Sequence, residues 1–229
     1  MELETILKDR SSGQSKIIRM TIELLKKTKR KNERIDICKK VCSAHKAMAG
    51  LRWLLKQVEG GKAISEIEAE IEKMDDGCAK NLERIAEGKV VTTISRSHIV
   101  ERGLLKAKHV IVLESTPGRE GLEMARYLRG RGLLATTFPD SAIGYAVKAC
   151  DIVVVGADAV LENSFINKTG TLSLALTAKH FSKDFYVASP SYKFAEVEFE
   201  ESIDLTFSDD MLFELIPSSL VTKFVTERE

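Results

Sequence analysis

The residues between positions 156 and 171 are the ones best suited to chemistry. This segment, GADAVLENSFINKTGT, follows an apolar run and contains Asp158, Asn167 and Lys168. The residues Thr169-Gly170-Thr171 then open the apolar helical stretch LSLAL. Free N–H groups at a helix start favour an anion, and the Lys168 ammonium adds a positive charge. Asn167, Lys168, Gly170 and Thr171 are therefore candidate ligand-binding residues, and Asp158 could act as a general base or hydrogen-bond a hydroxyl.

The same residues have a simpler structural interpretation. Asp158 would cap a turn, and Thr171 would cap the following helix. Asp is common at the start of loops, so these residues taken alone favour the structural interpretation.

Two other loops place polar side chains directly after apolar runs. In ESTPGREG, residues 114–121, Arg119 precedes a helix and could clamp a phosphate, although a solvated first-turn residue is the simpler alternative. In TTISRSH, residues 92–98, Ser95 and Arg96 offer a hydroxyl and a positive charge. The neighbouring His98 does not indicate a hydrolase, because no strained GxSxG turn accompanies it.

Several classes of function are excluded or disfavoured. The His and Cys residues lack HxxxH and CxxC spacing, and neither GxGxxG nor GxxxxGK[ST] occurs, so we expect no metal and no cofactor. A net charge of +1 excludes a bulk polycation. The basic run at 26–34 lacks aromatic residues, so direct nucleic-acid binding is not expected. No apolar run is long enough to cross a bilayer, and the four scattered cysteines favour the cytoplasm.

The polar loops need a scaffold, and the second half of the chain predicts a parallel sheet. Apolar β-branched runs alternate with helical stretches, which is typical of strands covered by helices on both faces. Ligands bind such sheets outside the carboxyl ends of the strands, and every polar loop named above follows a strand. The expected strands are 89–94, 109–113, 134–138, 151–155 and 184–188, and the expected helices are 97–106, 119–131, 141–149 and 170–182.

The first half predicts three amphipathic helices, from apolar residues spaced three and four apart. They cover Gln14 to about Lys31, residues 37–58 ahead of Gly60-Gly61, and residues 64–85. The predicted fold class is therefore α/β, with an N-terminal helical domain at 1–87 followed by a Rossmann-like, doubly wound parallel sheet at 88–229.

Two features near the carboxyl terminus predict association. Residues 196–214 hold eight acids and no base, and we expect them to pair within the chain or with a partner. The last stretch, FELIPSSLVTKFVTERE, is apolar almost to its end. Such a terminus docks on the core or is buried between subunits.

Taken in order, six segments resemble a known superfamily. It contains the alpha, beta and delta regulatory subunits of eukaryotic translation initiation factor 2B, methylthioribose-1-phosphate isomerase and ribose-1,5-bisphosphate isomerase. The segments are VVTTISRSHIVERGLLKAKHVIVLESTPGREGLEMARYLRGRG, DSA at 140–142, VVVGADAVLEN, INKTGTLSLALTAKHF, YVASPSYKF and FELIPSSLVTKFVTE.

The resemblance implies a helical domain, a Rossmann-like domain that forms a homodimer, and a phosphosugar or nucleotide monophosphate pocket at the carboxyl ends of the strands. In the isomerases a Cys and an Asp move protons, and an Asn-Lys pair positions the substrate. Asp158 matches the catalytic Asp, while Asn167 and Lys168 match the Asn-Lys pair.

Three departures bear on catalysis. TTISRS has no Cys after the first strand, and Ile94 lies near its place. The segment SSGQSKIIRM lacks the Arg-Gly phosphate motif of the isomerases. Nine steps rather than ten separate Asp158 from Asn167. Aldose–ketose isomerisation needs an acid/base pair that spans two carbons, and Asp158 supplies only half of it.

The leading hypothesis is thus a non-catalytic regulatory subunit of the initiation factor 2B type. It would be a cytoplasmic homodimer that binds translation-factor subunits and retains a phosphosugar or nucleotide pocket. The alternatives are an aldose–ketose sugar-phosphate isomerase with altered acid/base chemistry, and a metabolite sensor that uses the same pocket.

Overall fold

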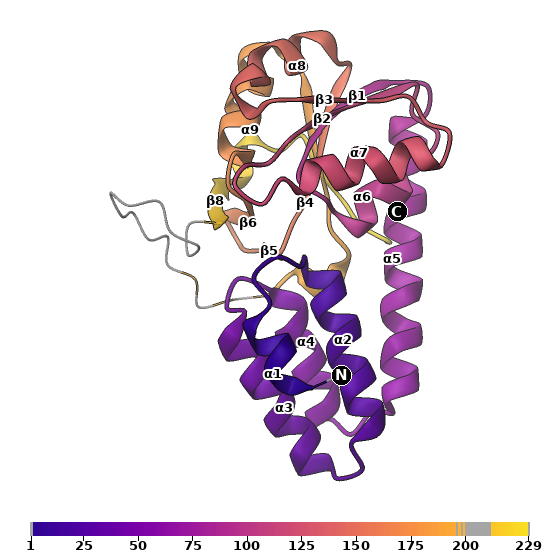
Figure 1. The fold of residues 1–229 in the computed structure, drawn as a ribbon, viewed down its shortest axis with the longest axis vertical. Coiled ribbons are helices and arrows are strands. Elements are labelled where there is room, and N and C mark those ends of the chain that lie inside the picture. The colour runs from indigo at the N-terminus through magenta and orange to yellow at the C-terminus, as the bar shows by residue number, and fades with distance from the viewer. Residues whose placement is uncertain (1, 196, 198, 200–211, 229) are drawn as a thin grey trace.

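The computed structural model describes residues 2–195, 197, 199 and 212–228. A group of helices from the first half of the chain lies beneath an α/β unit from the second half, and one long helix runs alongside both (Figure 1).

The first half folds into five helices rather than the three expected. Their apolar faces meet in one core, which includes Ile17, Leu25, Leu51 and Ile67, all nearly inaccessible to solvent. The helices are α1 (Leu3–Lys8), α2 (Gln14–Lys27), α3 (Lys31–Ala44), α4 (Ala49–Glu59) and α5 (Ile64–Ala86).

The single helix predicted over 37–58 is wrong, because the chain turns between α3 and α4. His45 leaves the helical region with φ −129° and ψ 62°, and its imidazole Nε2 lies 2.8 Å from the Ile6 carbonyl oxygen. The backbone N–H of Ala49 instead donates to the Asp158 carbonyl oxygen. Contacts with other segments thus override an apolar spacing that continues through the turn.

The second half contains the predicted parallel sheet. All five expected strands are confirmed, and their order with the terminal strand is β3-β2-β1-β4-β7-β9, with every pair parallel. This order corresponds to the Rossmann arrangement. Strands β1 to β3 extend the sheet toward one side, and from β4 onward the strands are added on the other side of β1. The strands are β1 (Val90–Ile94), β2 (His109–Leu113), β3 (Ala135–Phe138), β4 (Ile152–Gly156), β7 (Asp184–Ala188) and β9 (Lys223–Val225).

Helices cover both faces of this sheet, as predicted. One face packs against α5, α6 and α7 through residues such as Val91, Val112 and Met124. The other face packs against α8 and α9 through residues such as Val153, Val155 and Leu174. These helices are α6 (His98–Gly103), α7 (Glu120–Gly130), α8 (Ile143–Ala149) and α9 (Thr171–His180).

The long helix α5 belongs to both cores. Its first half, with Ile67, packs among the N-terminal helices, and its second half, with Leu82, packs against the sheet (Figure 1). This helix ends just before residue 87 and packs in both cores. A domain boundary at residue 87 remains a prediction.

A second, antiparallel sheet takes two of its three strands from the segment where the sequence predicted a loop. It has the order β5-β6-β8, formed by β5 (Ala159–Val160), β6 (Ser164–Lys168) and β8 (Phe213–Pro217). Phe165 and Ile166 are both fully buried, in different apolar clusters, because successive strand residues face opposite sides. The loop predicted over 156–171 is therefore corrected to a two-strand segment that ends in a short turn before α9.

The apolar terminus docks on its own chain. It supplies β8 to the small sheet and β9 to the edge of the large sheet, where Val225 is fully buried. Most of the acidic stretch 196–214 lies outside the described residues. Among the helices that the structure describes, none combines the length and apolarity needed to span a membrane.

Candidate functional site: the carboxyl edge of the sheet

The predicted site residues follow strands β1, β2 and β4, at the edge of the sheet where the strand order reverses. Ser95 follows β1, Ser115 follows β2, and Asp158 follows β4. Ser95 and Ser115 have φ values of 62° and 64°, so the backbone turns sharply as it leaves each strand. This edge, called the carboxyl edge below, also receives the end of β6 and the start of α9.

Asp158 is held at the junction between the helical part and the sheet. Its carbonyl oxygen accepts hydrogen bonds from Ala49 N at 3.0 Å and from the Gln14 side-chain amide at 2.9 Å. Burial raises the pKa of the Asp158 carboxyl, while the charges of Lys193 and Lys168 and a backbone hydrogen bond from Gln14 act in the opposite direction. A carboxyl with a raised pKa is suited to exchange protons, and this property is shared by structural and catalytic acids.

Asn167 and Thr171 hold the turn into α9 together. The Asn167 side-chain amide donates to the Thr171 hydroxyl at 3.0 Å, and that hydroxyl donates to the Lys168 carbonyl oxygen at 2.5 Å. Between them Gly170 adopts φ 99°, a left-handed conformation, and a Cβ there would lie 2.8 Å from Ile94 Cδ1. The predicted ligand-binding residues are therefore adjacent, and these side chains make their hydrogen bonds to one another.

The Lys168 ammonium is neutralised within the chain. Its Nζ lies 2.8 Å from Glu120 Oε1, and only 8% of the Lys168 side chain and 21% of the Glu120 side chain are exposed. Glu120 Oε2 is buried and has no hydrogen-bond partner among the described residues. The Lys168 ammonium is therefore already paired with a carboxylate of its own chain.

The amino end of α9 also faces a carboxylate from its own chain. The backbone N–H of Leu172, in the first turn, donates to Glu214 Oε1 at 2.7 Å. An acid at this position is stabilised by the free N–H groups and by the helix dipole. The anion predicted at this helix start is supplied by strand β8.

A third carboxylate binds the loop after β2. Asp140 accepts hydrogen bonds from Ser115 N at 2.8 Å and from Thr116 N at 2.7 Å, through its two oxygens. The Ser115 hydroxyl in turn accepts a hydrogen bond from Ser95 N at 2.5 Å. Asp140 therefore fixes the loops after β1 and β2 by the kind of backbone contact that a phosphate would make.

The two predicted arginines are directed elsewhere. Arg96 bonds Glu101 at 2.8 Å and Glu123 at 3.2 Å, on the outer side of α7. Arg119 has φ 58° and a side chain that is 59% exposed, 3.6 Å from Glu114. Their proposed ligand-binding roles stay predictions, and the charged contacts of both side chains are with carboxylates of this chain.

The two cysteines nearest the sheet in sequence bond to backbone carbonyls. The Cys78 thiol donates to Val225 O at 3.2 Å, and the Cys150 thiol donates to Val147 O at 3.2 Å. Burial raises the pKa of the Cys150 thiol, which disfavours the reactive thiolate. Ile94, which is 3% exposed, brings an apolar side chain against Gly170 at the end of β1.

Sequence reasoning did not predict where the acids at this edge come together. Asp140 lies in the DSA segment, and Glu214 lies in the acidic stretch that was expected to pair within the chain or with a partner. Nothing in the local spacing of Glu120, Asp140 and Glu214 indicates that they converge. Sequence reasoning also missed Lys193, whose ammonium is buried and donates to Ala157 O at 2.9 Å. The described residues include no group of three or more His, Cys, Asp or Glu side chains that could hold a metal ion.

Comparison with known proteins decides the family. Residues 18–228 match the Initiation factor 2 subunit family, IF-2B. The chain belongs to this family. Over 190 residues it is 29% identical to a Pyrococcus abyssi protein named as translation initiation factor eIF-2B subunit 2-like. That alignment spans 79% of this chain and 66% of the relative, so about a third of the relative's length lies outside it.

Solved structures agree with this assignment. The translation initiation factor eIF-2B of Pyrococcus horikoshii superposes with a TM-score of 0.85 at 26% identity, over 98% of this chain and 93% of that one. Two more distant structures share the fold alone. They are a chain of the tetrameric eIF2B-beta2-delta2 complex of C. thermophilum (TM-score 0.66, 20% identity, 95% and 91% covered) and 5-methylthioribose 1-phosphate isomerase of P. horikoshii (TM-score 0.65, 16% identity, 88% and 73% covered). The resemblance inferred from the sequence is confirmed.

Proposed function

We propose that this IF-2B family member is a non-catalytic subunit that acts by binding other proteins. The observation that carries the proposal is the occupation of the carboxyl edge by the chain's own acids. Glu120 pairs with Lys168, Glu214 accepts from the start of α9, and Asp140 accepts from the loop after β2. A sugar phosphate would have to displace carboxylates that are already bonded, at the expense of those interactions.

The missing acid/base partner supports the same proposal. Isomerisation of an aldose phosphate moves a proton between two carbons, and it requires an acid/base pair that spans both carbons. Asp158, with its raised pKa, supplies one group, and the apolar Ile94 stands at the end of β1. The isomerase relative shares only the fold with this chain, so it does not transfer its activity.

The enzyme alternative has a direct test. The protein at stoichiometric concentration is incubated with methylthioribose-1-phosphate or ribose-1,5-bisphosphate, and ketose product is followed by NMR. We expect none. Product that disappears in Asp158→Asn, and persists in the control Asp184→Asn at the opposite edge of the sheet, would overturn the proposal.

We further propose that the chain forms a homodimer through the α/β part. Tyr145 on α8 and Leu176 on α9 are 78% and 51% exposed, although both are large and apolar. The two helices pack beside each other over one face of the sheet, so both exposed side chains lie on that side of the sheet. Sedimentation at micromolar concentration should give a dimer that Tyr145→Glu converts to a monomer. A wild-type monomer would contradict this.

The partners that we propose are other subunits of the IF-2B family. The relative named as an eIF-2B subunit supports partners of this kind. The four free cysteines and the translation-factor relatives support a cytoplasmic location. Co-expression with a second IF-2B subunit of the same genome should yield one complex on gel filtration. Separate elution of the two chains at micromolar concentration would count against the proposal.

A further inference from the structure

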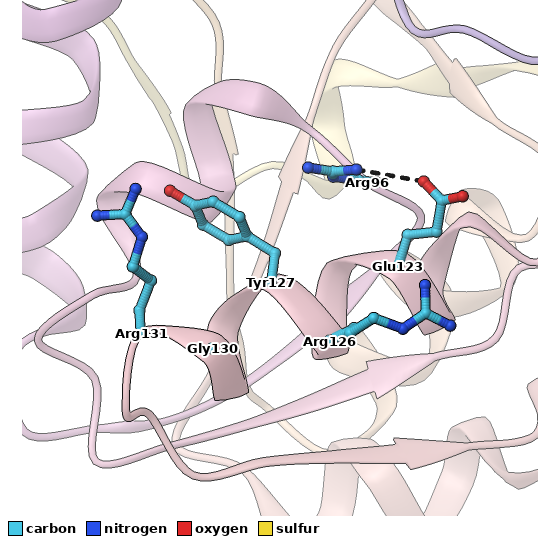
Figure 2. Close-up of a pocket in the computed structure, with 6 residues that line it drawn as sticks. All are labelled: Arg96, Glu123, Arg126, Tyr127, Gly130 and Arg131. Carbon is cyan, nitrogen blue, oxygen red and sulfur yellow. Dashed lines mark hydrogen bonds and ion pairs between the residues drawn. The ribbon is translucent and has the colours of Figure 1, made fainter.

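A hollow of about 530 Å³ lies beside α7, and none of the acids that occupy the carboxyl edge lines it. The hollow is open to solvent and lined largely by charged side chains. Figure 2 shows the side chains around it. Arg131 and Arg126 lie on opposite sides of Tyr127, and Arg96 is paired with Glu123. The lining residues are Arg96, Glu123, Arg126, Tyr127, Gly130 and Arg131.

The charges around this α7 hollow are unbalanced. Among the described residues, three guanidinium groups and the Glu123 carboxylate line it. Arg96 is paired with both Glu123 and Glu101, so the unbalanced charges are those of Arg126 and Arg131. Glu123 pairs with Arg96 at 3.2 Å, but its side chain is 60% exposed and free to turn toward solvent. The residues that the structure describes supply no ion pair to the guanidinium groups of Arg126 and Arg131.

The guanidinium groups are partly held in place before any ligand arrives. The Arg131 and Arg96 guanidinium carbons lie 5.2 Å and 5.7 Å from the Tyr127 ring centroid. These distances are typical of cation–π contacts. Arg96 is also fixed by Glu101 at 2.8 Å. Preorganised side chains lose less conformational entropy on binding, which favours a tight contact.

We propose that this hollow binds a linear phosphate chain, of the kind carried by nucleoside di- and triphosphates. Guanidinium groups pair with phosphate oxygens in bidentate fashion, and three of them spread around one hollow suit several phosphates better than one. In the described part of the chain, the lining contains no aliphatic side chain that could anchor a peptide. The Tyr127 ring already contacts two guanidinium groups, so the phosphates rather than a base are recognised.

Gly130 offers a way to block the hollow without disturbing the helix. It is the last residue of α7 and lines the hollow, and a Cβ placed on it meets nothing within 4 Å. Gly130→Glu therefore brings a negative charge to the site with room for its stem. Gly130→Ala is the matched control, since it makes the same backbone change without the charge.

The probe is sodium tripolyphosphate, titrated by calorimetry into the full chain at constant ionic strength. We expect saturable binding, weakened about tenfold by Arg126→Ala or by Arg131→Ala, as for loss of a charge-assisted contact. Gly130→Glu should weaken binding at least as much, and Gly130→Ala should not. Lys148→Ala, which removes a positive charge from α8 on the opposite face of the sheet, should leave the affinity unchanged.

Two further titrations distinguish the source of the phosphates. ATP should bind about as tightly as tripolyphosphate, and AMP at least tenfold more weakly, because the chain length and not the base is recognised. The proposal is overturned if tripolyphosphate shows no saturable binding at millimolar concentration. It is also overturned if Gly130→Glu binds it as the wild type does, or if AMP matches ATP.

Discussion

The carboxyl edge of the sheet and the α7 hollow treat positive charge in opposite ways. At the edge, Lys168 and the start of α9 are bonded to buried or partly buried carboxylates of the same chain. In the hollow, Arg126 and Arg131 face solvent, and the Glu123 carboxylate beside them is itself mostly exposed. The edge has the position of a ligand site in this fold, whereas the hollow has the unbalanced charge of one.

The difference indicates that loops can have the position of a ligand site in a fold without presenting unpaired charges to a ligand. A Rossmann-like sheet places loops together at the strand ends whether or not a ligand binds there. When carboxylates of the same chain pair with the basic groups, those contacts stabilise the fold instead of binding a ligand. Removing an edge contact should therefore destabilise the protein, and removing a hollow contact should not.

The largest effect is expected at the Lys168–Glu120 pair. Lys168→Ala leaves the Glu120 carboxylate without its partner, and we expect it to lower the free energy of unfolding by about 3 kcal/mol. Urea denaturation measures the loss. Adding Glu120→Gln should recover most of it, since the unpaired charge is then gone. A loss below about 1 kcal/mol would mean that the pair behaves as an exposed one.

A smaller loss is expected at Asp140. Asp140→Ala removes the acceptor of two backbone N–H groups, those of Ser115 and Thr116. Because the site is partly exposed, we expect a loss of about 2 kcal/mol by urea denaturation. Asp140→Asn retains one acceptor oxygen and should lose about half as much. Equal stability of Asp140→Ala and wild type would show that water replaces the carboxylate without cost.

Asp158 should make the free energy of unfolding depend on pH. Since burial raises its pKa above the ordinary 3.8, the folded state binds more protons than the unfolded state between that value and the raised one. The free energy of unfolding therefore falls as pH rises through this window. Asp158→Asn should thus gain stability relative to wild type as pH rises above 3.8, measured by thermal unfolding. A difference that stays constant with pH would contradict the raised pKa.

The smallest effect is expected in the hollow. Glu123→Gln breaks an exposed ion pair with Arg96 and should change the free energy of unfolding by less than about 0.5 kcal/mol. The same substitution removes a negative charge from the lining, so tripolyphosphate should bind more tightly. A loss of stability near that of Lys168→Ala would remove the contrast between the two regions.

The sequence predicted most of the fold, because strands and helices leave a local periodic signal. The parallel strands and their covering helices were located by alternating apolar runs. The break between α3 and α4 could not be predicted, since His45 and Ala49 turn the chain through contacts with Ile6 and Asp158. Likewise β6 was missed because its pairing partner β8 lies about fifty residues later in the chain.

The candidate site was predicted only in part. The sequence identified Asp158, Asn167 and Lys168 as neighbours, since they follow a strand and precede a helix. It expected the acidic stretch that contains Glu214 to pair within the chain or with a partner. It did not identify the approach of Glu120 to Lys168 or of Glu214 to α9, because both depend on tertiary structure. Those two acids are the ones that change the interpretation of the site from ligand binding to internal pairing.

The most direct test is a calorimetric titration of methylthioribose-1-phosphate and ribose-1,5-bisphosphate into the wild-type chain. If the carboxyl edge is occupied by its own acids, neither ligand should bind saturably up to millimolar concentration. Saturable binding that Lys168→Met abolishes, and that Gly130→Glu leaves intact, would place a sugar phosphate at the carboxyl edge. That result would contradict the proposal that internal carboxylates close this edge to ligands.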